Sequence, residues 1–265
     1  MKHSILTALS PEYPWKEHFH FFPELGSTND ELKRMARQGA PHGTVLIADR
    51  QTGGHGRMGR SFLSPGGVGI YLSILLRPDC TPMELMHLTC ATAVAMCDAV
   101  EAATGLRPGI KWTNDLVSGK RKLGGILTEL GLSPKGRVDY AIIGIGINCC
   151  QQEQDFAPEI RGMAGSLSMV TGKEIDRSRV AAAMMDALHR MSGQLLTEKK
   201  ATLASYRKDC ITLGQEISVL RGDSIRHGIA VDVDEEGALV VTYRDGTSEA
   251  VNSGEVSIRG MYGYV

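Results

Sequence analysis

The amino-acid sequence predicts an α+β protein, with a mixed, largely antiparallel sheet flanked by helices and a small β-domain after it. Three observations lead to this prediction. Apolar runs too short for helices predict buried strands. Short turn motifs between consecutive strands predict antiparallel pairing. Apolar residues spaced three and four positions apart predict helices. Hairpin connections within the sheet distinguish this fold from a doubly wound parallel one.

Helix boundaries are marked by capping residues. Thr28 and Glu31 have the spacing of a capping box, in which a hydroxyl and a carboxylate bind the first free amides of a helix. The same spacing recurs at residues 81–84, where proline occupies the first helical position. Glycines follow both apolar stripes and provide the stops. Helices are therefore expected at residues 28–39 and 81–105, from about 176 to 195, and at 203–210.

Buried strands are predicted where short runs of isoleucine, leucine and valine occur. Two turn motifs, at residues 118–119 and 134–136, join consecutive runs and predict hairpins. The expected strands lie at residues 45–48, 70–76, 126–130 and 140–147.

The sequence changes in character near residue 212. After this point short strand-like pieces alternate with turns at residues 221–223, 234–237 and 245–246. Turns at this spacing are typical of a small antiparallel barrel or meander. We therefore predict two domains, residues 1–212 and 213–265.

Composition excludes several classes of protein. The 265 residues carry 29 Lys and Arg against 30 Asp and Glu, a net charge of −1, which argues against a general electrostatic grip on nucleic acid. Six cysteines without a CxxC pair predict neither a disulfide framework nor a zinc site. No apolar run approaches ~20 residues, so no membrane span is expected. The N-terminal apolar stretch is too short for a signal peptide. A reducing cytoplasm is the predicted location.

Residues 51–60 (QTGGHGRMGR) combine four glycines with two arginines directly after a predicted strand. Glycines allow close backbone approach, free amides bind oxyanions, and guanidinium groups pair with phosphate. The segment contains GxGxxG, but no helix signal follows it, so a Rossmann fold is rejected. No GKS or GKT is present, which rejects a Walker A loop. The alternative is a flexible surface loop.

Two further segments carry lysines with polar neighbours. Residues 111–115 (KWTND) bring a cation, an amide and a carboxylate together, and strand alternation would place Lys111, Thr113 and Asp115 on one face. Lys122 begins a predicted strand and is followed by Gly124 and Gly125, which leave room for a ligand beside the backbone. The alternatives are an ordinary polar turn and a bulged strand with a solvated lysine.

Three other candidates for functional residues can be explained equally well by a structural role. Residues 144–148 (GIGIN) end an apolar strand with a polar amide, and their glycines suit close packing. Residues 27–29 suit helix capping. His87 is expected to be an ordinary core or surface histidine. No Ser/His/Asp or Cys/His arrangement is present, so the residues themselves indicate an anion-binding loop and a lysine on a facing strand.

Taken in order, these segments resemble the biotin protein ligase family. The matching motifs are residues 26–29 (GSTN), 51–60, 111–115, 121–127 (RKLGGIL) and 144–148. The resemblance implies a class II synthetase-like catalytic core with a C-terminal SH3-like barrel. It implies two steps: the biotin carboxylate attacks the α-phosphate of ATP, forming biotinyl-5′-adenylate, and a carrier-protein lysine then attacks this anhydride and releases AMP.

The resemblance also assigns roles. Lys122, Arg57 and Asp115 would be catalytic: Lys122 stabilises charge on the reacting groups, Arg57 retains the adenylate, and Asp115 orients the incoming lysine or the phosphate. The resemblance also implies two groups of binding residues, which share Arg57 and Lys122 with the catalytic set. Those implied to bind biotin are Ser27, Thr28, Asn29, Gln51, His55, Gly56, Arg57, Lys122, Gly124 and Gly125, and those implied to bind the nucleotide are Arg57, Arg60, Lys111, Asn114 and Asn148.

Biotin and ATP are the implied substrates, with Mg²⁺ expected alongside ATP and no metal ligands identified. The implied partner is a biotin carboxyl carrier protein of acetyl-CoA carboxylase or another biotin-dependent carboxylase. Homodimers are common among relatives, although nothing in the sequence fixes the oligomeric state. Only about 25 residues precede Ser27, too few for the DNA-binding winged helix that some relatives carry, so no repressor activity is expected.

His55 departs from the family, which has an arginine at this position of the loop. An imidazole is a cation only part of the time near neutral pH, so retention of the adenylate is expected to differ. Residues 150–165 are expected to cover the nucleotide, or else to be a plain surface connection. Two alternative functions remain: a lipoate or octanoate ligase or transferase of the same fold, and a non-catalytic biotin sensor.

Overall fold

The computed structural model describes residues 1–252 and, for the backbone alone, 257–260. Its larger part is a seven-stranded sheet in the order β1-β2-β3-β7-β6-β5-β4. Only β1 and β2 pair in parallel, and every other neighbouring pair is antiparallel. The strands are β1 (Phe19–Leu25), β2 (Thr44–Gln51), β3 (Gly69–Leu76), β4 (Gly109–Lys111), β5 (Asp115–Ser118), β6 (Arg121–Leu132) and β7 (Val138–Asn148). The predicted mixed, largely antiparallel sheet is confirmed.

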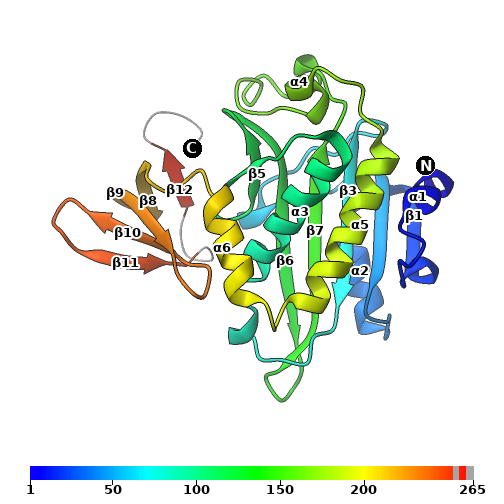
Figure 1. Ribbon diagram of the computed structural model, residues 1–265, viewed down its shortest axis with the longest axis horizontal. Coiled ribbons are helices and arrows are strands. Elements are labelled where there is room, and N and C mark those ends of the chain that lie inside the picture. The colour runs from blue at the N-terminus through cyan, green and yellow to red at the C-terminus, as the bar shows by residue number, and fades with distance from the viewer. Residues whose placement is uncertain (253–256, 261–265) are drawn as a thin grey trace.

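Helices cover the two faces of this sheet unequally. Two long helices, α3 (Leu88–Thr104) and α5 (Arg177–Gln194), lie together across one face, with α6 (Lys199–Asp209) beside α3 (Figure 1). Among the described residues, the one helix on the opposite face is α2 (Thr28–Arg37), whose Leu32 and Ala36 pack on Leu46, Leu75 and Ile142. Successive side chains of a strand point to opposite faces of the sheet. The strands therefore contribute one set of side chains to the core under α2 and another set to the core under α3 and α5. The rest of the second face is left open.

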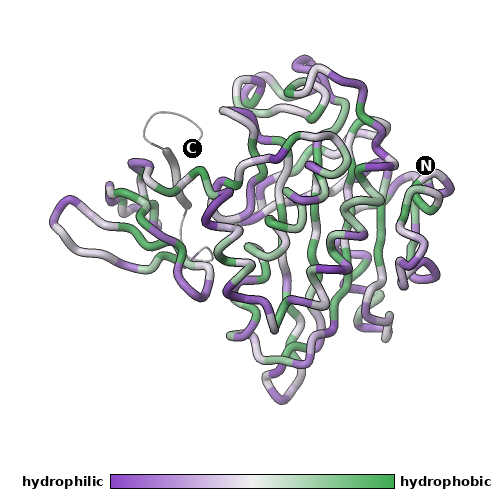
Figure 2. Tube along the Cα trace, viewed as in Figure 1, coloured by the Kyte–Doolittle hydropathy of each residue, from purple (hydrophilic) through white to green (hydrophobic). Residues whose placement is uncertain are grey.

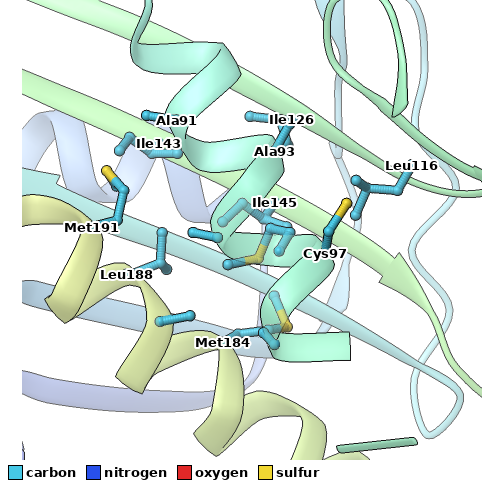
Figure 3. Packing of buried hydrophobic residues seen from close by; sticks show 14 of the residues in the cluster. Ala91, Ala93, Cys97, Leu116, Ile126, Ile143, Ile145, Met184, Leu188 and Met191 are labelled. Carbon is cyan, nitrogen blue, oxygen red and sulfur yellow. The ribbon is translucent and has the colours of Figure 1, made fainter. Parts of the chain in front are cut away.

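The main core lies between the sheet and the pair α3 and α5. Figure 3 shows small residues of α3, Ala91, Ala93 and Cys97, close to Ile143 and Ile145 of β7, with Met184 and Leu188 of α5 alongside. Alanine-rich α3 allows a close approach to the sheet, and the methionines of α5 fill the remaining space. Figure 2 shows the same distribution, with hydrophobic segments concentrated along the central strands.

Capping follows the predicted motifs with shifts of a few residues. The N-cap of α2 is Ser27, not Thr28, and its hydroxyl accepts from the Asp30 amide. Glu84 does accept hydrogen bonds from the amide and hydroxyl of Thr81, but this motif begins the short 3₁₀ turn Met83–Leu85, and α3 follows it. Helix α5 begins after Asp176 and α3 ends at Gly105, both as predicted.

The N-terminal elements α1 (Lys2–Ala8) and β1 have no counterpart among the predicted elements. Helix α1 has no side-chain cap, and β1 contains Pro23, which disfavours a strand assignment except at an edge. β1 is an edge strand, so its position in the sheet accommodates the proline.

One helical segment is apolar enough to raise the question of a membrane. Met83–Thr104 is long enough to cross one and contains an 18-residue window with a mean hydropathy of 1.2, although Glu84, Asp98 and Glu101 interrupt its apolar residues. However, 67% of its apolar window is buried inside the protein. Its apolar character is explained by its place at the centre of the main core.

The C-terminal part is a five-stranded antiparallel sheet in the order β11-β10-β9-β8-β12. Its strands are β8 (Glu216–Arg221), β9 (Ser224–Val233), β10 (Leu239–Tyr243), β11 (Ser248–Val251) and β12 (Ser257–Gly260). Left-handed glycines lie in the predicted turns, at Gly222, Gly237 and Gly246. The inward side chains form a small core, consistent with the expected SH3-like domain.

The β9–β10 turn contacts the larger sheet through Trp112. Its indole Nε1 donates to the Gly237 carbonyl at 3.0 Å, and its backbone amide donates to the Thr212 hydroxyl at 2.9 Å. The Tyr206 hydroxyl donates to the next carbonyl, that of Thr113, at 3.1 Å. The β4–β5 turn is therefore fixed by groups that come from outside the sheet.

We expect Trp112→Phe to lower the free energy of unfolding by about 1–3 kcal/mol, because the buried Gly237 carbonyl loses its N–H donor. Urea denaturation measures this. Tyr13→Phe is the matched control: the Tyr13 hydroxyl is buried without a hydrogen-bond partner, so its removal should cost nothing. Equal midpoints for Trp112→Phe and wild type would contradict the expected role of the indole.

Candidate functional site

A cavity of about 680 Å³ occupies the open part of the second sheet face, next to the N-terminus of α2. The strands that form its floor have glycine, and so no side chain, at several positions that face the cavity. Gly125 of β6 lies opposite Gly146 of β7, and Gly144 lies between Ser73 of β3 and Leu127 of β6. Glycine at these positions leaves the space above the sheet open to a ligand.

Most of the predicted site residues line this cavity. They are Ser27, Thr28, Asn29, Gln51, His55, Gly56, Arg57, Arg60, Lys111, Asn114, Asp115, Lys122 and Gly125. They come from four separate segments of the sequence, residues 27–29, 51–60, 111–115 and 122–125, and the fold brings them to one place.

Gly124 and Asn148 lie outside the cavity wall. Gly124 faces the other side of β6, where a Cβ would meet the Gly146 carbonyl at 2.5 Å. Asn148 is buried at the end of β7; its amide donates to the Gly165 carbonyl and its oxygen accepts from Gln151. Asn148 therefore anchors Gly165 and Gln151 to the end of β7, a structural role that the motif alone did not reveal.

The glycine–arginine segment folds back on itself as a loop over the cavity. The Phe62 amide donates to the Gly54 carbonyl at 2.9 Å, and the Gly56 amide donates to the Arg60 carbonyl at 2.7 Å. A Cβ on Gly54 would lie 2.6 Å from the Phe62 carbonyl, so glycine is required for this approach. At the tip, Met58 has a left-handed backbone (φ 56°) and a largely exposed side chain.

Arg57 reaches from this loop across the cavity. Its Nη1 donates to Asn114 Oδ1 at 3.0 Å. Burial lowers the pKa of Arg57 and the Asp115 carboxylate opposes this effect, but an arginine remains a cation at neutral pH. The loop thus places a fixed positive charge beside the β4–β5 turn.

The 111–115 segment is a hairpin turn and not a continuous strand, which corrects the expected alternation. β4 ends at Lys111, β5 begins at Asp115, and these two residues pair across the hairpin. Both line the cavity, whereas Thr113 is buried and outside it. The cation and the carboxylate face the cavity together because they are cross-strand partners.

Lys122 and Asp115 form the charged centre of the site. Lys122 Nζ lies 2.5 Å from Asp115 Oδ1, with side chains 30% and 16% exposed. A Cβ at Gly125 would lie 3.5 Å from the Lys122 ammonium, so a larger residue there would crowd this pair. The lysine is held at the cavity surface, where it can meet a ligand anion without losing its carboxylate partner.

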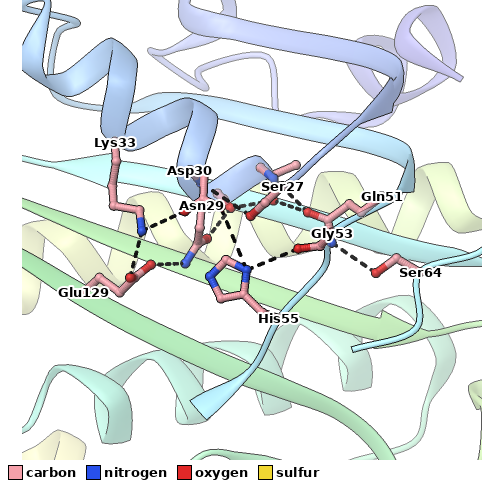
Figure 4. Close-up of polar contacts among 11 residues, drawn as sticks. Ser27, Asn29, Asp30, Lys33, Gln51, Gly53, His55, Ser64 and Glu129 are labelled. Carbon is pink, nitrogen blue, oxygen red and sulfur yellow. Dashed lines mark hydrogen bonds and ion pairs between the residues drawn. The ribbon is translucent and has the colours of Figure 1, made fainter. Parts of the chain in front are cut away.

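At the other end of the cavity is a set of hydrogen bonds that we call the Asn29 network, comprising Thr28, Asn29, Gln51, Ser73 and Glu129. Asn29 Nδ2 donates to Glu129 at 2.8 Å, and its Oδ1 lies 2.6 Å from Ser73 Oγ. Ser73 Oγ lies 2.7 Å from Thr28 Oγ1, whose hydroxyl lies 2.9 Å from Gln51 Oε1. Figure 4 shows this network beside the N-terminus of α2.

The ends of the Asn29 network are held by neighbouring groups. Gln51 Nε2 donates to Ser64, whose hydroxyl donates to the Phe62 carbonyl. At the opposite end, Lys33 pairs with Glu129 at 2.9 Å and with Asp30 at 2.8 Å. Burial lowers the pKa of Lys33, but its hydrogen bonds to Asp30 and Glu129 raise it by more, so Lys33 is a cation at neutral pH.

His55 projects into the space between the loop and α2. Its Nδ1 lies 3.2 Å from the Gly53 carbonyl and 4.0 Å from the Asp30 carboxylate (Figure 4). His55 Nδ1 therefore faces two acceptors from the protein, the Gly53 carbonyl and the Asp30 carboxylate. His87, by contrast, is buried, and its Nε2 lies 2.9 Å from the Leu195 carbonyl, as expected of a core histidine.

Residues 150–165 lie along the start of β6. The Lys122 amide donates to the Met163 carbonyl at 2.6 Å, and the Gly165 amide donates to the Lys122 carbonyl at 2.9 Å. Met163 also lines the cavity. Whether this segment covers a nucleotide is untested and stays a prediction.

Several residues at the site were not predicted from the sequence. Phe62 lines the cavity, whereas Ser73 and Glu129 lie outside its lining and hold the lining residue Asn29 through hydrogen bonds. Ser73 had one usable signal, as the only polar residue in the apolar run of β3. The role of Glu129 depends on strand register and on the position of α2, which no local pattern contains.

Within the described residues no group of three or more His, Cys, Asp and Glu side chains could hold a metal ion. The cavity does contain one carboxylate, Asp115, and the Asn114 amide next to it. Mg²⁺ commonly binds through one or two carboxylates together with substrate phosphates. These residues fit an ion carried by a nucleotide better than a dedicated protein site.

Comparison with known proteins gives concordant findings. Residues 21–148 match the profile of the Biotin/lipoate A/B protein ligase family, and residues 212–259 match that of the Biotin protein ligase C terminal domain. The bifunctional ligase/repressor BirA of Bacillus spizizenii is 35% identical over 87% of this chain and 71% of its own. The biotin–[acetyl-CoA-carboxylase] ligase of Mycobacterium tuberculosis is 31% identical over 88% and 86%.

A similar solved structure is the biotin protein ligase from Aquifex aeolicus in complex with biotin and ATP. It is 31% identical, has a TM-score of 0.76, and the similarity covers 91% of this chain and 98% of that one.

Proposed function

Because the chain belongs to the biotin/lipoate protein ligase family, we propose that it is an ATP-dependent biotin ligase that forms biotinyl-5′-adenylate and transfers biotin to a lysine. The observation that carries this proposal is the cavity itself. An anion-binding end with Lys122, Asp115 and Arg57 adjoins an end that is lined by neutral hydrogen-bonding side chains, those of Ser27, Thr28, Asn29 and Gln51. A ligand with a cyclic urea at one end and a carboxylate at the other matches both.

The biotin ring is assigned to the Asn29 network end. Ser27, Thr28, Asn29 and Gln51 line it with hydroxyl and amide groups, and the bare strand floor leaves space for a bicyclic ring. The valeryl chain then runs over Gly125 toward Lys122. His55 and Gly56 of the loop cover the ring from above.

The chemical step is assigned to the charged centre. As the biotin carboxylate attacks the α-phosphate of ATP, negative charge increases on the phosphate oxygens, and Lys122 is placed to stabilise it. Pyrophosphate leaves, and Arg57 holds the resulting adenylate under the loop. Asp115, bound to Lys122, then orients the acceptor lysine, whose amine attacks the anhydride, loses a proton and releases AMP.

The nucleotide is assigned to the β4–β5 turn and the loop tip, with Arg60, Lys111 and Asn114 as its contacts. We do not extend this assignment to Asn148 or Gly124, which lie outside the cavity wall. Mg²⁺ is proposed to enter on the ATP phosphates, with Asp115 as the carboxylate available to it; when bound, it would neutralise phosphate charge.

The proposed acceptor is a biotin carboxyl carrier protein, because relatives are named for acetyl-CoA carboxylase. We further propose two domains, residues 1–212 and 213–265, and a cytoplasmic location that suits the six free cysteines. A homodimer is the expectation from the family.

Biotin-dependent ATP–pyrophosphate exchange tests the function, with lipoate and octanoate assayed in parallel. Exchange with biotin alone is the expected result. Exchange with lipoate or octanoate would assign the protein to the sister ligases, and tight biotin binding without exchange would indicate a sensor. Transfer to a purified carrier domain then tests the acceptor.

His55 gives a prediction specific to this chain. We expect His55→Arg to form the adenylate normally but to release it more slowly, by about three- to tenfold at pH 8, because guanidinium is always charged and imidazole is not. Adenylate dissociation is followed by filter binding at pH 8. Identical rates for His55→Arg and wild type would remove the basis for this prediction.

A further inference from the structure

Lys122 faces the cavity because of an irregularity in strand β6. The pairing of β6 with β5 passes from Gly124 directly to Lys122 and skips Leu123, so β6 contains a β-bulge. Leu123 and Gly124 both face the main core, whereas strict alternation would turn one of them toward the cavity. Gly125 and Lys122, on either side of this pair, both face the cavity. A regular strand would instead turn the Lys122 side chain toward the core.

The backbone of Lys122 is bound by the segment that joins β7 to α4 (Leu167–Thr171) (Figure 1). The pairing of β6 with β7 begins only at Gly124. At Lys122 the segment takes the place of β7: the Lys122 amide donates to the Met163 carbonyl at 2.6 Å, and the Gly165 amide donates to the Lys122 carbonyl at 2.9 Å. Both backbone polar groups of the lysine at the bulge are therefore satisfied by residues 163–165.

The side chain of Arg121 binds the same segment. Its Nη1 donates to the Ala164 carbonyl at 3.1 Å, and its Nη2 lies 3.5 Å from the Glu153 carboxylate. The stem of Arg121 lies against Gly165, where an alanine Cβ would fall 2.8 Å from Arg121 Cβ and 3.0 Å from its Cδ. The segment thus comes into direct contact with the residue that precedes Lys122.

The segment is also held on the side of β7. The buried Asn148 amide donates to the Gly165 carbonyl at 3.0 Å, and the Ser166 hydroxyl donates to the Gln151 carbonyl at 2.7 Å. Because residues 164–166 are buried and bonded in this way, a Cβ added at Gly165 would displace Arg121 more readily than the segment. A displaced Arg121 shifts the bulge and the next residue, Lys122.

We propose that Arg121 and Gly165 are positioning residues, which hold residues 163–165 against the bulge and so place the Lys122 ammonium beside the reacting phosphate. This inference rests on the proposed function and assigns a role in the reaction to two residues that do not line the cavity. Misplacement of a reacting group by about 1 Å costs up to ~10²-fold in rate. A segment that only covered the nucleotide would change ATP binding instead.

Gly165→Ala tests the proposal in biotin-dependent ATP–pyrophosphate exchange. We expect kcat to fall about 10- to 100-fold, with the KM values for biotin and ATP changed by less than about twofold, because the ammonium moves and the binding groups do not. Gly162→Ala is the matched control and should have the wild-type rate. Gly162 is exposed in the same segment, and a Cβ there meets no atom within 4 Å. Neither glycine has a positive φ, so the backbone at both positions accepts alanine.

Arg121→Ala provides a second variant, which does not crowd the segment. It removes the donor to the Ala164 carbonyl, and kcat should fall about tenfold. Arg121→Lys retains a donor and most of the stem, and should recover most of this loss. Thermal denaturation confirms that each variant is folded.

Combination with Lys122→Ala separates positioning from a general structural role. A positioning residue acts only through the Lys122 ammonium. In the Lys122→Ala background, Gly165→Ala and Arg121→Ala should therefore lower the residual kcat by less than about twofold. A loss as large as in the wild-type background would overturn the proposal. A rise in the KM for ATP with kcat unchanged would also overturn it, and would assign the segment to nucleotide binding.

Amide hydrogen exchange separates failure of this inference from failure of the proposed function. The Lys122 amide donates to the Met163 carbonyl, so its hydrogen exchange, followed by NMR without substrates, reports on the contact itself. We expect it to be about tenfold faster in Gly165→Ala than in wild type or Gly162→Ala. Absence of biotin-dependent ATP–pyrophosphate exchange in wild type would overturn the proposed function. Unchanged protection of the Lys122 amide in Gly165→Ala would overturn only the present inference.

Discussion

Lys122→Ala is expected to lower the rate of biotin-dependent ATP–pyrophosphate exchange by about 10²–10³-fold. The Lys122 ammonium is the charge in contact with Asp115 at the cavity surface, and Arg57 is directed to Asn114 instead. Without the Lys122 ammonium, no preorganised cation lies next to the negative charge that develops on the α-phosphate. The effect should fall on kcat more than on the KM for biotin, whose ring is bound at the far end.

Lys120→Ala is the matched control for this prediction. Lys120 is in the same β5–β6 hairpin, two residues earlier, and its side chain is exposed away from the cavity. Backbone pairing of Lys122 with residues 163–165 does not depend on its side chain, so Lys122→Ala should keep its thermal stability. Exchange within threefold of wild type would remove Lys122 from the catalytic role.

Gly144→Ala is expected to raise the Kd for biotin by about 100-fold and to lower the free energy of unfolding by several kcal/mol. An alanine Cβ would lie 2.1 Å from Asn29 Oδ1 and 2.7 Å from its Cγ, so the buried amide must be displaced. Displacement breaks the bonds to Ser73 and Glu129 together and leaves buried polar groups unpaired. Calorimetric titration with biotin and urea denaturation measure the two effects.

Gly193→Ala serves as the control, because a Cβ there has no atom within 4 Å and the residue lies within α5. It should be neutral or slightly stabilising. The double variant Gly144→Ala with Asn29→Ala removes the clashing amide, and should regain stability but not biotin affinity. Normal biotin affinity in Gly144→Ala would show that the Asn29 network does not contribute to the site.

The elements that could be predicted from sequence are those whose signals are local. Each of these signals depends on a few neighbouring residues. They are the apolar spacing in α3 and α5, the apolar runs in β3 and β7, and the glycines in the turns. β1 was missed because Pro23 is acceptable only at a sheet edge, and edge position is a property of the whole sheet.

The same distinction applies to the site. The glycine–arginine loop and Lys122 were predictable because residue type and spacing carry their chemistry. Ser73 and Glu129 were not, because their importance comes from strand register and from the packing of α2 against β7. The prediction that residues 111–115 alternate along one strand was wrong, because the chain reverses direction there. Lys111 and Asp115 both face the cavity because they pair across the hairpin.

The position of Trp112 makes the site suitable for optical measurement. The chain has two tryptophans: Trp112 lines the cavity, and Trp15 packs against the rings of His42 and His189 on another part of the molecule. A Trp15→Phe variant therefore has a single intrinsic fluorophore next to the reacting groups. Stopped-flow fluorescence of that variant could follow ligand entry, adenylate formation and release in real time, without a label.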